Sequence, residues 1–102
     1  MTDWLSRELL IPGDHPSAEG HFPGDPIVPG ALLLDAAVAA IAGEVGDGRF
    51  VIPSAKFLRP VRHGAPLVLR WRPLGAGLFR FECCSAQEVA LTGTLRHTQG
   101  AA

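Results

Sequence analysis

Residues 20–45 read GHFPGDPIVPGALLLDAAVAAIAGEV, and this stretch decides the fold because a stiff loop passes directly into a long apolar segment. Its first eleven residues contain three prolines and three glycines. Proline fixes φ and glycine permits positive φ, so we expect the whole loop, residues 14–30, to be rigid and specially shaped. From Ala31 to about Val45 the sequence predicts the chain's one substantial helix. That segment is apolar nearly all round, which indicates burial on most of its sides.

The residues after this helix have the pattern of β-strands. Apolar and polar residues alternate over 67–72, 79–84 and 89–95, which is the period of half-buried strands. Residues 74–77 and 85–87 fit hairpin connections, so these strands should be antiparallel neighbours. A short strand over residues 7–12 and a longer one over 49–62, irregular at Pro53, complete the set. The sequence therefore predicts an α+β domain in which a curved antiparallel sheet wraps around the helix.

Length and composition are those of one globular domain spanning residues 1–102. The chain is 47% hydrophobic and 19% charged, and we expect only the first few residues and those from about 98 onward to be flexible. The N-terminus shows no signal-peptide pattern, and the longest apolar segment is too short to span a bilayer. Cys83 and Cys84 are adjacent, a spacing that suits neither an ordinary disulfide nor a CxxC site. These features predict a cytoplasmic protein with reduced cysteines and no contact with a membrane.

Charge is divided unevenly along the chain. Residues 1–48 hold eight carboxylates and one arginine, a net charge of −7, whereas residues 49–102 hold eight basic residues and two carboxylates, a net charge of +6. In one interpretation these charges neutralise each other across neighbouring elements or lie on solvated faces. In the other, the basic half forms a patch for an acidic macromolecule or a phosphate group. The basic residues are not interleaved with aromatic ones, which argues against a nucleic-acid partner.

Several motifs resemble one family of enzymes. Gly20–Gly24 (GHFPG), Pro26–Gly30 (PIVPG) and Leu34-Asp35, with Asp14–Pro16 before them and Ala55–Val61 (AKFLRPV) after them, resemble the beta-hydroxyacyl-acyl carrier protein dehydratases. The resemblance covers roughly residues 9–96 and is strongest to the short single-domain branch found with polyene or pigment-type acyl pathways. It implies the hot-dog fold, in which a central helix is wrapped by a five- to six-stranded antiparallel sheet, and a dimeric assembly.

The resemblance also implies roles for two residues. His21 would be the general base that removes a proton from C2 of a 3-hydroxyacyl thioester, and an imidazole titrates near neutrality, which suits that task. Asp35 would be the acid that assists departure of the 3-hydroxyl group, and in this family the histidine and the acid come from different protomers. The structural alternatives are a turn histidine bonded to backbone and an aspartate favoured by the helix dipole. Asp rather than Glu at this position is typical of members that also isomerise the double bond.

Further residues would bind the substrate. The N–H of Gly30 would stabilise the thioester carbonyl, although this glycine could equally serve only the turn geometry. The remaining loop residues that would contact substrate are Phe22, Pro23, Gly24 and Pro29. Three basic residues would bind the phosphopantetheine phosphate or the acidic carrier protein, or else belong to a solvated strand face: Lys56, Arg59 and Arg62.

No cofactor and no metal are expected. His15, His63 and His97 lack cysteine partners at ligand spacing, and we interpret them as structural. The expected partners are acyl carrier protein and a second hot-dog chain, identical or related. Two other functions remain possible, namely an acyl thioesterase that uses an acid to activate water, and a non-catalytic subunit of a hot-dog heterodimer.

Overall fold

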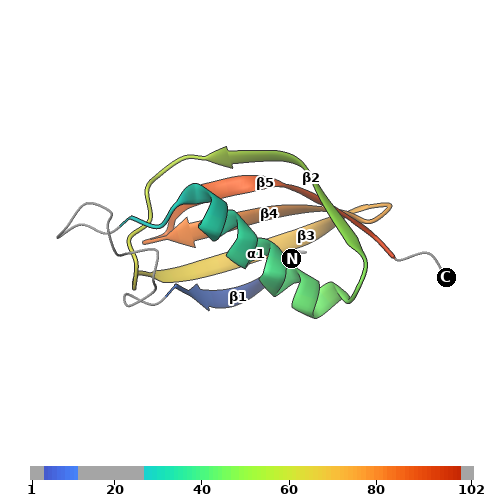
Figure 1. Ribbon diagram of the computed structural model, residues 1–102, viewed down its shortest axis with the longest axis horizontal. Helices are drawn as coiled ribbons and strands as arrows, with labels where there is room; N and C mark the ends of the chain where they lie inside the picture. The colour runs from blue at the N-terminus through green and yellow to red at the C-terminus, as the bar shows by residue number, and fades with distance from the viewer. Residues whose placement is uncertain (1–3, 12–26, 100–102) are drawn as a thin grey trace.

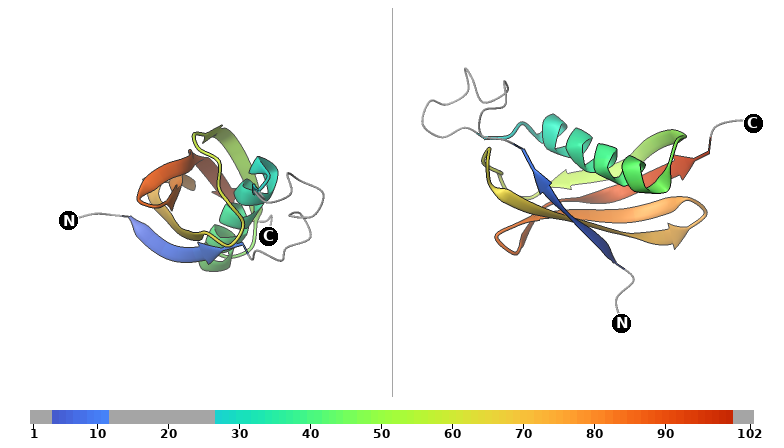
Figure 2. Two further views of the ribbon diagram at one scale, coloured as in Figure 1. Left: turned by 90° about the vertical axis from the view of Figure 1, so that its left-hand side faces the viewer. Right: turned by 90° about the horizontal axis from the view of Figure 1, so that it is seen from below.

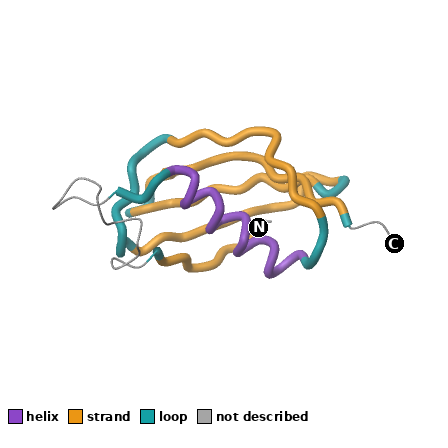
Figure 3. Tube along the Cα trace, viewed as in Figure 1, coloured by secondary structure: helices purple, strands orange, loops and turns teal. Residues whose placement is uncertain are grey.

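The computed structural model describes residues 4–11 and 27–99 (Figure 1). This part of the chain contains one helix, α1 (Gly30–Val45), and five strands that form a single antiparallel sheet. The strands lie in the order β1-β3-β4-β5-β2, so β1 and β2 form the two edges (Figure 3). Their bounds are β1 Leu5–Leu10, β2 Arg49–Phe57, β3 Pro66–Gly75, β4 Leu78–Ser85 and β5 Glu88–Thr98.

The two expected hairpins are confirmed. Residues 76–77 join β3 to β4, and residues 86–87 join β4 to β5. Ala86 and Gln87 have φ values of 52° and 66°, the left-handed conformation that a tight two-residue turn between twisted strands requires. The predicted irregularity at Pro53 is also confirmed, because the register of β2 against β5 shifts between Val51 and Ser54. A proline without an N–H is tolerated there because β2 is an edge strand.

The sheet curls around the helix, so that α1 lies in its hollow (Figure 2). Leu33, Ala37 and Ile41 recur at the four-residue spacing of one helix face, and each is at most 2% exposed. They meet the inward residues of the central strands, which the alternating pattern places on one face of the sheet. The buried residues from these strands are Leu67, Leu69, Trp71, Phe81, Cys83, Leu91 and Leu95. The predicted α+β arrangement is confirmed.

The helix is less buried than its composition suggested. Ala31, Asp35 and Ala39 are exposed, and they form a second face of α1 at the same four-residue spacing. The expectation of burial on most sides is therefore wrong for the single chain, and Asp35 in particular lies at the surface. The physical reason is that the sheet covers one side of α1, while the mean hydropathy of a segment does not say how many sides are covered.

Three boundaries differ from the sequence-based ones. The helix begins at Gly30, one residue earlier, and β1 covers residues 5–10 rather than 7–12. The strand expected over 49–62 ends at Phe57. Beyond it the N–H groups of Leu58 and Arg59 both donate to the Ala90 carbonyl, at 2.8 and 3.4 Å, so the ladder no longer advances. Pro60 then has no N–H to continue it. Residues 1–3 and 100–102, where flexibility was expected, lie outside the described residues.

Candidate functional site

The predicted site residues divide into two groups. His21, Phe22, Pro23 and Gly24, together with His15, lie outside the residues that the structure describes. The described residues are Pro29 and Gly30 at the start of α1, Asp35 one turn further on, and Lys56, Arg59 and Arg62 at the end of β2 and beyond it.

The N-terminus of α1 is held in place by backbone bonds to the segment that follows β2. The Val28 N–H donates to the Val61 carbonyl at 2.7 Å, and Ile27 pairs with Arg62 in an isolated antiparallel bridge. Pro29 then adopts φ −56° and ψ 139°, and its carbonyl accepts from the Leu32 and Leu33 N–H groups at 3.0 and 3.1 Å. The helix therefore begins just after Ile27 and Val28, two residues whose backbones are paired with a distant part of the chain.

The first turn of α1 offers polar N–H groups to its surroundings. Helix geometry leaves the N–H groups of the first turn without intrahelical acceptors, and these carry the positive end of the helix dipole. Pro29 makes no side-chain capping hydrogen bond, and the first turn contains no acidic residue. The Gly30 and Ala31 N–H groups thus lie at an electropositive helix end suited to a developing negative charge.

Gly30 leaves space for a neighbouring ring and does not have an unusual backbone conformation. It is not among the glycines with positive φ, which removes the turn-geometry explanation. A Cβ built on Gly30 would lie 3.1, 3.2 and 3.3 Å from Cε1, Cζ and Cδ1 of Phe57. One edge of the Phe57 ring therefore packs against the α-carbon of Gly30, a contact that the sequence alone did not indicate.

Two hollows flank the first turns of α1. One, of about 460 Å³, lies between the helix start and the segment after β2 and is lined by Val28, Gly30, Leu33 and residues 57–61, among others. The other, of about 490 Å³, is lined by Leu34, Asp35, Val38 and Ile52, together with Ala31 and Leu32. Among the residues that the structure describes, Asp35 is the one titratable group lining this second, otherwise apolar hollow. Asp35 therefore presents a carboxyl group, a type of group that can accept or donate a proton, beside apolar walls.

The three basic residues expected to bind the substrate carrier lie in one region of the chain. Lys56, Arg59 and Arg62 are all exposed, in the segment that contains the end of β2 and the chain after it. The Arg59 guanidinium already has an acidic partner, because its Nη1 lies 3.0 Å from Oε2 of Glu88. The structure thus ties Arg59 to β5, a contact that the sequence did not indicate.

The structure describes two histidines, His63 and His97, and both lie outside the hollows beside α1. His63 is 9% exposed in the connection between β2 and β3. The ring of His97 stacks on Phe50 with centroids 4.8 Å apart, and its Nε2 lies 2.8 Å from the Asp47 carbonyl oxygen. His97 thus ties the connection between α1 and β2 to the last strand.

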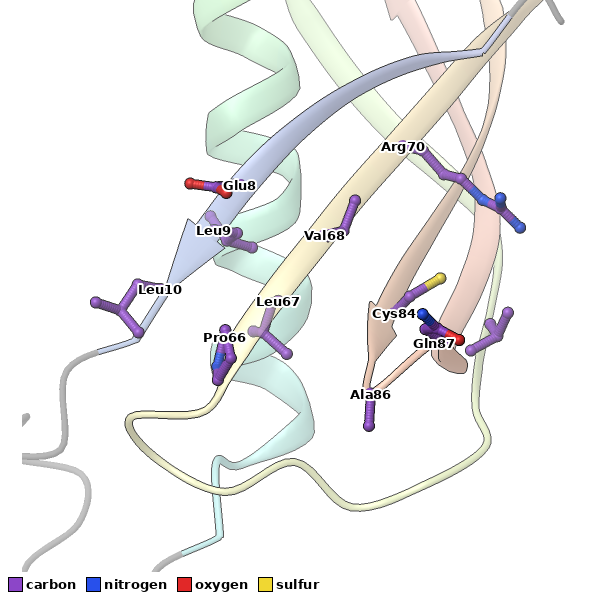
Figure 4. Close-up of a pocket in the computed structure, with 11 residues that line it drawn as sticks. Glu8, Leu9, Leu10, Pro66, Leu67, Val68, Arg70, Cys84, Ala86 and Gln87 are labelled. Carbon is purple, nitrogen blue, oxygen red and sulfur yellow. The ribbon is translucent and has the colours of Figure 1, made fainter.

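A third hollow, larger than the two beside α1, was not expected from the sequence. It measures about 710 Å³ and lies on the outer face of the sheet, away from α1 (Figure 4). Leu10 and Val68, exposed by 61% and 44%, contribute apolar walls, and Arg70 at its rim is bonded through Nε to Oε1 of Glu82 at 2.8 Å. Its residues come from β1, β3, β4, β5 and the turn between β4 and β5, so no single local motif marks it.

The cysteines are unbonded thiols, as their spacing predicted. Burial, with a smaller contribution from Cys84, raises the pKa of Cys83 to about 11. Burial also raises the pKa of Cys84, against an opposing effect of Arg70. Neither thiol has the lowered pKa of a nucleophilic cysteine.

Neither a membrane-spanning helix nor a metal cluster is found in the described ranges. Over residues 4–11 and 27–99, no helix has both the length and the apolar character needed to cross a bilayer. Within the same residues, no three His, Cys, Asp or Glu side chains come together in a way that would hold a metal ion.

Comparison with known proteins identifies the family. A family profile described as "ApeI-like: ApeI dehydratase" matches residues 2–94, nearly the whole chain. The chain belongs to this family. The match includes the first turn of α1, Asp35 and the segment after β2, and it confirms the resemblance to hot-dog dehydratases inferred from the motifs.

Curated relatives of this ApeI-like chain carry the name 3-hydroxyacyl-[acyl-carrier-protein] dehydratase FabZ. The protein from Chloroflexus aggregans is 42% identical over 71 residues, which cover 61% of this chain and 49% of the relative. The protein from Wolbachia pipientis is 33% identical over 85 residues, or 70% of this chain and 59% of the relative. The chain therefore spans about half to three-fifths of the length of these relatives.

Solved structures confirm the hot-dog fold. The dehydratase heterocomplex ApeI:P from Xenorhabdus doucetiae matches with a TM-score of 0.72 at 21% identity, covering 92% of this chain and 86% of that one. The dehydratase domain from the CurF module of Curacin polyketide synthase matches with a TM-score of 0.76 at 13% identity, covering 99% and 40%. At these identities the likeness concerns the fold.

Proposed function

We propose that this chain is a hydro-lyase that removes water from a 3-hydroxyacyl thioester and forms the trans-2-enoyl thioester. The observation that carries the proposal is the uncapped first turn of α1, with Asp35 one turn further on, in a chain that matches the dehydratase profile over residues 2–94. Curated relatives named as 3-hydroxyacyl-[acyl-carrier-protein] dehydratases support the same reaction.

In the proposed mechanism, the thioester carbonyl accepts a hydrogen bond from the Gly30 N–H at the positive end of α1. His21 removes a proton from C2, and the negative charge that develops on the carbonyl oxygen is stabilised by that N–H and the helix dipole. The C3–O bond then breaks as Asp35 donates a proton to the departing hydroxyl, and water leaves. The C2–H electron pair becomes the new double bond. The loop residues Phe22, Pro23, Gly24 and Pro29 would shape the binding site around C2.

The site is proposed to be completed by a second hot-dog chain. In the single chain Asp35 and its neighbours Ala31 and Ala39 are exposed, which leaves one face of α1 available to a partner. Edge strand β2 also carries an exposed Val51 and Phe57, at 50% and 49%. We propose that His21 of one protomer meets Asp35 of the other, in a homodimer or in a heterodimer with a related chain such as the one named in the ApeI:P complex.

The acyl substrate is proposed to arrive on acyl carrier protein through its phosphopantetheine arm. Lys56 and Arg62 are exposed near the helix start, where they can meet a phosphate or an acidic protein surface. Arg59 lies in the same region and pairs with Glu88, whose Oε2 lies 3.0 Å from its Nη1. A cytoplasmic location belongs to the same proposal, because acyl synthesis on a carrier protein supplies the substrate.

The test is an assay of the purified chain, alone and with candidate partner chains, on a 3-hydroxyacyl thioester of acyl carrier protein. The proposal predicts an enoyl product and the reverse hydration of an added enoyl thioester. Free acid and free thiol as the main products, with no enoyl species, would instead identify a thioesterase. If this chain is inactive alone, and a partner chain is active both with it and without it, this chain would be a non-catalytic subunit.

A further inference from the structure

Phe57 occupies an unusual position for a large aromatic residue. It is the last residue of β2, paired with Leu91 of β5, and it remains 49% exposed. The next residue, Leu58, donates its N–H to the Ala90 carbonyl at 2.8 Å, so the backbone on both sides of Phe57 is bonded to β5. The backbone that carries the ring is therefore held by the sheet.

The sheet brings this ring to the start of the helix. Three consecutive ring carbons, Cδ1, Cε1 and Cζ, lie 3.3, 3.1 and 3.2 Å from the point where Gly30 would carry a Cβ. A ring edge in that position lies beside the α-carbon of Gly30, whose own N–H belongs to the first turn. The edge of an aromatic ring also carries partial positive charge, so it favours a negative charge developing nearby.

Both the position of the ring edge and its partial charge concern the electrostatics of the proposed site. A hydrogen bond from a backbone N–H to a developing oxyanion is stronger where water is excluded. The hollow of about 460 Å³ beside Gly30 is lined by Phe57 itself, so the exposed part of the ring borders the space available to a ligand. Leu33 and Val28, both buried, line the same hollow and give it apolar walls, with Arg59 as its one charged residue among the described ones.

We propose that Phe57 is a positioning residue of this site, whose ring shields the Gly30 N–H from water and holds the thioester carbonyl against it. This inference rests on the proposed function for the identity of the substrate. It assigns Gly30 and Phe57 a shared task, because the absence of a Cβ at Gly30 is what admits the ring edge. Gly30 supplies the N–H that donates the hydrogen bond, and Phe57 keeps water away from that N–H.

The first experiment measures water exchange of the backbone amides by NMR on the full chain, without substrate. In Phe57→Ala the Gly30 amide should exchange severalfold faster than in the unsubstituted chain. The Gly46 amide, which donates to the Ala42 carbonyl at 3.0 Å at the other end of α1, should be unchanged and serves as the internal control. Leu74→Ala removes a comparably exposed side chain (45%) at the far end of the sheet and should leave both amides unchanged.

The second experiment measures kcat and KM for dehydration. Removing an oxyanion donor outright costs about 10²–10³ in kcat, so rehydrating a retained donor in Phe57→Ala should cost about tenfold in kcat and less in KM. Phe57→Leu, which keeps an apolar cover, should recover part of the loss. Gly30→Ala keeps the N–H but displaces the ring, so it should resemble Phe57→Ala and should add no further loss in the Phe57→Ala background.

The outcomes separate this inference from the proposed function. Faster Gly30 exchange in Phe57→Ala, in a chain that dehydrates no 3-hydroxyacyl thioester, would support the shielding and refute the function. An active enzyme in which Phe57→Ala changes neither Gly30 exchange nor kcat would refute the inference alone. A loss from Gly30→Ala that is equally large with and without Phe57 would also refute it, because the Cβ would then act on the substrate directly.

Discussion

Two glycine-to-alanine substitutions should have opposite effects on stability. Gly93 lies in β5 opposite Phe81 of β4 and Ala55 of β2. A Cβ at Gly93 would come within 2.4 Å of the Ser54 carbonyl oxygen and 2.9 Å of Cζ of Phe81. Neither obstacle yields easily, since one is backbone and the other is a fully buried ring (0% exposed). Gly43 is exposed on α1, and the nearest atom to its Cβ would be Arg7 Nη1 at 3.9 Å.

The expected magnitudes follow from these contacts. Overpacking a core typically costs about 1–3 kcal/mol, and at Gly93 both a strand and a core ring must move, so we expect the upper end, about 3 kcal/mol or more. For a domain of this size about 1 kcal/mol shifts Tm by about 4–8 °C, so Gly93→Ala should lower Tm by at least about 12 °C. Gly43→Ala should raise the free energy of unfolding by up to about 1 kcal/mol, because alanine is the better helix former.

Thermal and urea unfolding followed by circular dichroism would measure both changes. Protein concentration must be held constant, because an assembly that dissociates on unfolding makes Tm concentration-dependent. A Gly93→Ala variant as stable as the unsubstituted chain would refute the packing of β4, β5 and β2 described above. A destabilised Gly43→Ala variant would mean that the exposed face of α1 is closely covered in the assembled protein, with no room for a methyl group.

Three further predictions concern chemistry. Burial raises the pKa of Cys83 from 9.0 to about 11, so the unfolded chain loses this proton first. The contribution of Cys83 to stability should be full below pH 9 and should fall by up to about 3 kcal/mol as the pH rises to 11. The chain has no tyrosine to obscure this titration, and in urea-unfolding curves Cys83→Ala should remove this part of the fall and leave the part due to Cys84, whose pKa burial also raises. Lys56→Glu should raise KM for a carrier-protein substrate and not for a short thioester without the carrier, and Arg59→Gln and Arg62→Glu should change KM in the same direction. Equal effects on both substrates would place these residues elsewhere in the reaction. His21→Ala and Asp35→Asn should each lower kcat by about 10²–10⁴, as expected for the loss of a general acid or base, and full activity in either variant would refute its assigned role.

The strands were predictable because their side-chain alternation survives in the fold. Leu67, Leu69 and Trp71 face the core as the period of two requires, and both hairpins fall at the expected residues. The end of β2 was not predictable, because it depends on Leu58 and Arg59 sharing one acceptor on β5. The end of β2 thus depends on its pairing with β5, and the alternation of apolar and polar residues in β2 itself does not show it.

The sequence motif was enough to predict which residues belong to the candidate site. It was not enough to predict their exposure or their contacts. Gly30 and Asp35 could be selected because they follow the loop at fixed spacing, but the exposure of Asp35 depends on how far the sheet extends around α1. The contact between Phe57 and Gly30 joins residues 27 positions apart, and only the assembled sheet brings them together. The outer hollow likewise draws on four strands, so no single segment indicates it.

The most direct test of a shared dehydratase site mixes two inactive variants. His21→Ala and Asp35→Asn would be purified, combined in equal amounts under conditions that allow subunit exchange, and assayed for enoyl thioester formation. If each site takes His21 from one protomer and Asp35 from the other, a mixed dimer has one intact site, so random exchange should restore about a quarter of the original activity. A mixture that stays inactive after demonstrated exchange would contradict the shared site.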